Sequence, residues 1–209
     1  MPATSFPVFA LHQVVFPGAP LSLRVFEPRY RRLVDDVVPD GRFVVAAIRQ
    51  GREVAGPADV FRVGVTVGGA APDVLPDGSL ALDLAGHERV ALIEPIGDDP
   101  YPRWRCEPYP DEGGAGTDDV DAAVDALHAY LASIGEDEAR PAVPTDPVAA
   151  SYALAGAVPG LPAVRQSLLE LPGAGARLGR AAAVFRREAA LVRATGAGIA
   201  GADLGVSPN

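Results

Sequence analysis

The sequence predicts an α+β protein, in which a β-rich domain that closes or nearly closes into a small barrel is followed by a bundle of helices. Up to about residue 110, short apolar or alternating segments are separated by turn signals. After an acidic, Gly-rich stretch, apolar residues recur at helical spacing. We therefore expect a β-rich domain at 1–112, a flexible linker at 113–117, a helical domain at 118–195 and a frayed tail at 196–209.

The first thirty residues predict two short strands, a turn between them and the start of a helix. Val14–Phe16 consists of strand-forming residues. Pro17-Gly18 suits a type II turn, because proline fixes φ and glycine supplies a positive φ. Leu21–Val25 alternates apolar with polar residues, as a half-buried strand does. Pro28 fits the first position of a helix, which we expect to reach Val38.

Further strands are expected wherever apolar residues run together or alternate before residue 110. The segments are 43–48, 60–67, 80–86, 88–94 and 103–109. Gly64 within the second of them indicates a bulge or a tight bend. Leu75–Ser79 contains Asp77-Gly78, a hairpin turn signal, and is expected to form a loop.

The second half of the chain predicts four helices. The segments are 120–134, 147–158, 162–171 and 178–192. Asp146-Pro147 has the form of a cap followed by a first helical residue. Asp118 and Asp119 lie where the dipole of the first helix favours negative charge.

Charge and composition exclude several classes of function. The 209 residues carry a net charge of −9, whereas nucleic-acid-binding and anionic-membrane-binding surfaces are usually basic. All 18 basic residues are arginine, so a P-loop lysine, a Ser-Lys dyad and a Schiff-base lysine are excluded. No run of apolar residues approaches the length of a membrane span, and no basic segment precedes the first apolar stretch. We therefore expect a soluble, cytoplasmic protein that binds neither nucleic acid nor membrane.

Motifs for catalysis, metals or cofactors are missing or out of context. The single Cys106 cannot form an internal disulfide or a thiolate zinc site. His12, His87 and His128 have no metal-ligand spacing. The string at 196–201 matches G-x-G-x-x-G but follows a helix, whereas a dinucleotide site needs it after a strand. We expect no enzyme activity, no metal and no cofactor.

Several strings, taken in order, point to one family. They are Phe6–Leu11, Val14–Leu21, Phe26–Tyr30, Phe61–Val65, Leu75–Gly78, Gly86–Val90, Arg165–Glu170, Ala176–Leu178 and Phe185–Glu188. Together they resemble the N-terminal, substrate-binding domain of the ATP-dependent Lon protease, and most of all its stand-alone bacterial members. The resemblance covers about residues 5 to 194, although the family usually has Pro-Leu where this chain has Phe9-Ala10-Leu11.

The resemblance implies a PUA-like β-barrel followed by an α-helical bundle. It also implies a role in recognising and holding protein substrates. The chain ends where the ATPase of Lon would begin, so the resemblance assigns no ATPase or protease residues to it. We therefore expect a non-enzymatic module that binds unfolded or flexible protein segments.

The candidate binding residues are aromatic, proline and arginine residues near the start of the chain. They are Phe16, Pro17, Phe26, Arg29 and Tyr30. Of these, Phe16, Arg29 and Tyr30 are expected to be exposed, and exposed aromatic residues and arginine are typical of interface hot spots. The competing interpretation is structural, with Phe26 packed in the core, Glu27 capping the helix or pairing with an arginine, and Arg29 and Tyr30 beginning the helix. Other functions left open are an adaptor for a specific partner such as an ATP-dependent protease, RNA binding by analogy with PUA-like folds, and a hydrolase with a small site.

Overall fold

The computed structural model describes residues 4–38, 41–51, 59–136, 138–139 and 141–196. It confirms the predicted α+β class, because a mostly antiparallel sheet precedes a set of helices. The chain divides into two compact units, Met1–Pro110 and Asp111–Asn209. The predicted frayed tail lies outside the described residues from residue 197 onward.

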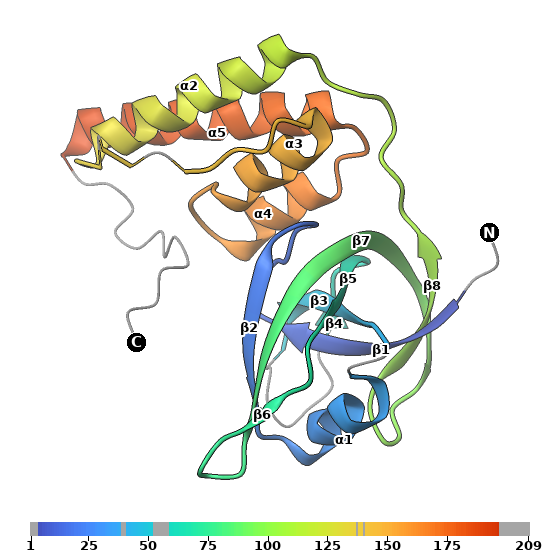
Figure 1. Ribbon diagram of the computed structural model, residues 1–209. Helices are drawn as coiled ribbons and strands as arrows, with labels where there is room; N and C mark the ends of the chain where they lie inside the picture. The colour runs from blue at the N-terminus through green and yellow to red at the C-terminus, as the bar shows by residue number, and fades with distance from the viewer. Residues whose placement is uncertain (1–3, 39–40, 52–58, 137, 140, 197–209) are drawn as a thin grey trace. The chain divides into compact units, whose positions relative to one another are not determined.

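The first unit contains the strands and one helix. In chain order the elements are β1 (Thr4–Leu11), β2 (Pro20–Val25), α1 (Pro28–Val37), β3 (Phe43–Gln50), β4 (Asp59–Val60), β5 (Val63–Gly69), β6 (Asp73–Val74), β7 (Leu80–Gly97) and β8 (Arg103–Pro108). Strand β1 pairs antiparallel with β8 and parallel with β3. Strand β8 pairs with β7, β7 with β5, and β5 with β3. Because β1 pairs with both β8 and β3, this series of pairings closes on itself (Figure 1).

Strand β1 is buried on both faces, which explains its continuous apolar run. Val8 and Ala10 pack on one face in a cluster that includes Cys106 of β8. On the other face, the Phe9 ring stacks on Tyr30 of α1, with 3.9 Å between ring centroids. Helix α1 thus covers the side of the sheet opposite the Val8 cluster.

Three sequence-based predictions for this unit are wrong, and one of them is the single strand predicted at 60–67, which is divided into β4 and β5. Val14–Phe16 is buried but lies outside any strand, and the first strand is Thr4–Leu11 instead. The strands predicted at 80–86 and 88–94 are one continuous strand, β7. The reason lies at Gly86, where an added Cβ would stand 2.2 Å from the Phe16 carbonyl oxygen. Because glycine has no side chain, the 14–16 segment packs directly against β7 at this position. Gly86 therefore lies within a continuous strand and does not end one.

The second unit contains four helices among its described residues. They are α2 (Thr117–Ser133), α3 (Pro147–Gly156), α4 (Pro162–Leu169) and α5 (Ala174–Thr195), and they confirm the four predicted segments. The Asp146 carboxylate accepts a hydrogen bond of 2.8 Å from the Ala149 N–H, as expected for the cap of α3. Helix α5 ends at Gly196, whose φ of 64° suits glycine. Helices α2 and α5 pack together through Tyr130 and Phe185, whose ring centroids are 6.0 Å apart.

Candidate binding pocket

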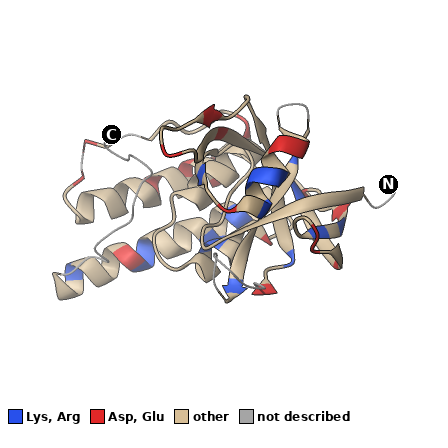
Figure 2. Cartoon of the chain, turned by 90° about the horizontal axis from the view of Figure 1, so that it is seen from below, with Lys and Arg blue, Asp and Glu red and all other residues tan. Residues whose placement is uncertain are grey.

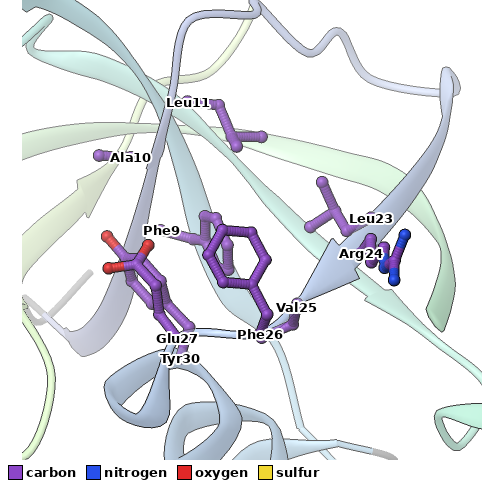
Figure 3. Close-up of a pocket in the computed structure, with 9 residues that line it drawn as sticks. All are labelled: Phe9, Ala10, Leu11, Leu23, Arg24, Val25, Phe26, Glu27 and Tyr30. Carbon is purple, nitrogen blue, oxygen red and sulfur yellow. The ribbon is translucent and has the colours of Figure 1, made fainter. Parts of the chain in front are cut away.

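A small apolar pocket lies in the first unit, between β1, β2 and the start of α1 (Figure 3). Its lining residues are Phe9, Ala10, Leu11, Leu23, Arg24, Val25, Phe26, Glu27 and Tyr30. Its volume is about 90 Å³. Cofactor and drug-sized sites usually need roughly 300–1,000 Å³, so this pocket suits a single side chain.

The alternation of side chains along β2 places Phe26 at the mouth of the pocket. Leu21 and Val25 point inward and are buried, while Ser22 and Arg24 are exposed. Phe26 follows Val25, so its side chain points to the opposite, outward side of the strand. Pro28 then starts α1. The Phe26 side chain is 59% exposed, and it lines the pocket together with Phe9 (Figure 3). A large apolar side chain thus remains exposed beside an apolar floor.

A stack of side chains supports one wall of the pocket. The Arg29 guanidinium lies 4.5 Å from the centroid of the Tyr30 ring, which in turn stacks on Phe9. Arg29 also forms an ion pair of 3.2 Å with the Glu27 carboxylate. These contacts bury Tyr30 and fix the orientation of Phe9 in the pocket wall.

Arg24 is held on the outer side of β2 by the loop between β6 and β7. Its guanidinium donates a hydrogen bond of 3.0 Å to the Ser79 hydroxyl and forms an ion pair with Asp77. The Ser79 hydroxyl and backbone N–H, followed by Arg24, lower the pKa of the Asp77 carboxyl to about 2. Asp77 therefore stays ionised at neutral pH and keeps Arg24 paired.

The predicted candidate residues do not all belong to this pocket. Phe26 and Tyr30 line it, and Arg29 supports it from behind Tyr30. The exposure expected for Phe16 and Tyr30 is wrong, because they are only 1% and 2% exposed. Phe16 and the half-buried Pro17 are not among the lining residues. The interpretation that Phe26 packs in the core is wrong as well.

Sequence reasoning missed the apolar floor of the pocket. Phe9 and Leu11 were assigned only to family strings, and Leu23 only to the buried side of a strand. The alternation of Leu21–Val25 was the available signal, since it predicts that Phe26 turns away from the core. No local pattern predicts that β1 and β2 lie close together, because their positions are set by pairing of β1 with β8 and of β2 with β7.

Two features of the described residues bear on other classes of function. No group of three or more His, Cys, Asp or Glu residues that could hold a metal ion occurs among them. Within the same part of the chain, each helix is too short or too polar to cross a membrane.

Comparisons with known proteins agree on one family. The sequence model described as "ATP-dependent protease La (LON) substrate-binding domain" matches residues 5–184. A crystal structure of a Lon N-terminal domain protein from Xanthomonas campestris is 29% identical, with a TM-score of 0.65 over 86% of this chain and 98% of that one. The N-terminal domain of a Mycobacterium avium complex Lon protease is 19% identical, with a TM-score of 0.63 over 87% and 98%, and shares the fold. No curated protein matches the chain.

Proposed function

Because the chain belongs to the family of ATP-dependent protease La (LON) substrate-binding domains, we propose that its β1–β2 pocket binds exposed apolar segments of unfolded or flexible proteins. Family and fold together make the chain a Lon-like substrate-recognition module. The location of the site and the apolar character of its ligand are what we add.

The observation that carries this proposal is the exposure of Phe26 beside an apolar floor. Exposed apolar residues are common on protein surfaces, but an exposed aromatic side chain beside a preformed apolar pocket is the arrangement expected of a binding site. Covering the exposed 59% of Phe26 would contribute roughly 1–2 kcal/mol. Contributions of that size favour weak binding of many sequences over tight binding of one.

The charged residues around the pocket support binding without catalysis. Arg24 is paired with Asp77, and Glu27 is paired with Arg29. A general acid or base needs a group that is available to exchange a proton with the ligand. Arginines elsewhere in the unit are paired in the same way, as at Arg49 with Asp59, and Figure 2 shows basic and acidic residues interspersed along the chain. This mixture does not favour the RNA-binding alternative, which needs a clustered basic face.

The test is the binding of a fluorescently labelled, reduced and carboxymethylated protein, with its native form as the reference. We expect fluorescence anisotropy to detect binding of the unfolded form, and Phe26→Ser to weaken it at least ten-fold. Val74→Ser is the matched control, because Val74 is 73% exposed on β6 and does not line the pocket. Equal losses in both variants, or no loss in Phe26→Ser, would overturn the proposal. Mass spectrometry should recover the ligand uncleaved.

A further inference from the structure

Strand β2 has one edge that no strand occupies in the described part of the chain. Its partner is β7, along the whole register from Pro20↔Ala85 to Val25↔Leu80. Unpaired strand edges present rows of N–H and C=O groups to any extended chain that approaches them. The pocket lies on this side of β2, toward β1.

The register shows which backbone groups face that edge. The Gly86 N–H donates a hydrogen bond of 2.9 Å to the Ala19 carbonyl. Because backbone groups alternate between the two edges of a strand, those of Leu21 and Leu23 point toward β7. The N–H and C=O groups of Ser22 and Arg24 therefore point away from β7. Proline is also tolerated at position 20, because an N–H at this position would point toward the unpaired edge of β2 and not toward β7.

Strand β1 offers a similar group on its side of the pocket. The Val8 N–H donates a hydrogen bond of 2.8 Å to the Pro102 carbonyl, which precedes β8. Because backbone groups alternate along the strand, the N–H and C=O groups of Ala10 point in the same direction as those of Val8, away from β3. Ala10 lies beyond the last residue that pairs with β8, which is Pro7, and it lines the pocket.

We propose that an extended, uncharged apolar peptide docks here as an added strand on the edge of β2. It would form hydrogen bonds with the backbone of Ser22 and Arg24 and place one apolar side chain in the pocket beside Phe26. This inference rests on the proposed function and adds the mode of binding. Strand addition suits a module with many ligands, because backbone hydrogen bonds do not depend on the ligand sequence.

The charge around the pocket selects this occupant. Arg24 and Glu27 are the charged residues that line it, and each is already paired with an oppositely charged side chain of the same unit. A charged peptide would therefore gain less from an ion pair here than it would beside an unpaired charge. An uncharged peptide leaves both pairs intact, and the pocket volume of about 90 Å³ accommodates one of its side chains.

The experiment compares two variants at one position of the open edge, of which only one keeps the backbone N–H. Arg24→Pro and Arg24→Ala both remove the side chain, but only proline removes the N–H that faces the open edge. The probe is the labelled peptide Gly-Ser-Val-Leu-Val-Ser-Gly, measured by fluorescence anisotropy. We expect Arg24→Pro to bind it at least ten-fold more weakly than Arg24→Ala. Circular dichroism checks that both variants fold.

A second arm leaves the protein unchanged and alters the peptide, so it decides the matter even if Arg24→Pro does not fold. One peptide is N-methylated at both Val residues and another at Leu, which blocks opposite edges of the added strand. We expect at least one of them to bind the unaltered protein ten-fold more weakly than the parent peptide. Binding of both at the parent affinity would overturn strand addition.

The remaining outcomes separate this inference from the proposed function. If the unfolded protein binds but the parent peptide does not, strand addition is overturned and the proposed function stands. If neither binds, both are overturned. Sedimentation of the unliganded protein as a dimer that Arg24→Pro dissociates would assign the edge to a second copy of this chain and overturn the peptide as its occupant.

Discussion

The guanidinium of Arg177 donates a hydrogen bond of 2.6 Å to the carboxylate of Asp111, joining α5 to the segment that precedes α2. Arg177 is fully buried, and its guanidinium also lies 3.9 Å from the centroid of the Tyr152 ring. It donates further bonds of 2.5 Å to the Ser151 hydroxyl and 3.0 Å to the Leu171 carbonyl. One arginine thus connects the main segments of the second unit.

Asp111→Asn should destabilise the second unit strongly, because it leaves the buried Arg177 cation without its carboxylate. Breaking a buried ion pair by removing one partner costs about 3–5 kcal/mol, and we expect the lower value because Asp111 is partly exposed. Urea denaturation measures the free energy of unfolding. Asp125→Asn is the control, since Asp125 is exposed on α2 and should change stability by less than about 0.5 kcal/mol. Equal losses of unfolding free energy in the two variants would contradict a stabilising role for the Arg177–Asp111 pair.

Phe9 and Phe26 should differ in what they contribute, although both line the pocket. Phe9 is 7% exposed and stacks on Tyr30, so Phe9→Ala should cost about 3–5 kcal/mol of stability. Phe26 is largely exposed, so Phe26→Ala should cost less than about 1 kcal/mol while weakening ligand binding. Thermal denaturation together with anisotropy distinguishes the two roles. A large loss of stability in Phe26→Ala would argue that its ring is packed in solution.

Gly86→Ala should destabilise the first unit, because the new methyl group would collide with the Phe16 carbonyl oxygen, only 2.2 Å away. Overpacking of this kind costs about 1–3 kcal/mol, and a backbone atom cannot move aside as a side chain can. Gly97→Ala, near the far end of β7, is the control, since nothing lies within 4 Å of its added Cβ. Calorimetric melting temperatures should fall for the first substitution only.

Cys106 should be chemically inert in the folded protein and should make stability depend on alkaline pH. Burial raises the pKa of its thiol from 9.0 to about 11, and the residue is 1% exposed. The unfolded thiol therefore ionises first, so its contribution to stability is fully present below pH 9 and is lost as the pH rises toward 11. Cys106→Ala should lack this part of the alkaline slope in urea denaturation. Iodoacetamide should modify the thiol in denaturant but hardly at all in buffer at pH 8, and rapid labelling in buffer would contradict the burial.

Local signals predicted most elements of the fold. Pro28 predicted the start of α1, and Asp146-Pro147 predicted the cap and first residue of α3, because each acts on the backbone within one turn. The continuation of β7 through Gly86 escaped prediction. A glycine that accommodates a distant carbonyl looks the same in a sequence as one that ends a strand.

The candidate pocket shows the same division. The string from Val25 to Tyr30 predicted the aromatic and arginine residues near the site, but it did not show which of them are exposed. Tyr30 is buried because Phe9 stacks on it, and Phe16 is buried where the chain passes Gly86 of β7. Both contacts join residues that are distant in the chain, so neither leaves a local pattern.

The sequence by itself determined the α+β class, the family, and the places of most helices and strands. Only the tertiary structure decided that β1 and β2 lie on either side of a pocket, that one edge of β2 pairs with no strand among the described residues, and that Arg177 pairs with Asp111. The physical reason is the distance along the chain over which each interaction acts. Propensity, capping and alternation act between residues a few positions apart, whereas a site forms where strand pairing and packing bring distant segments together.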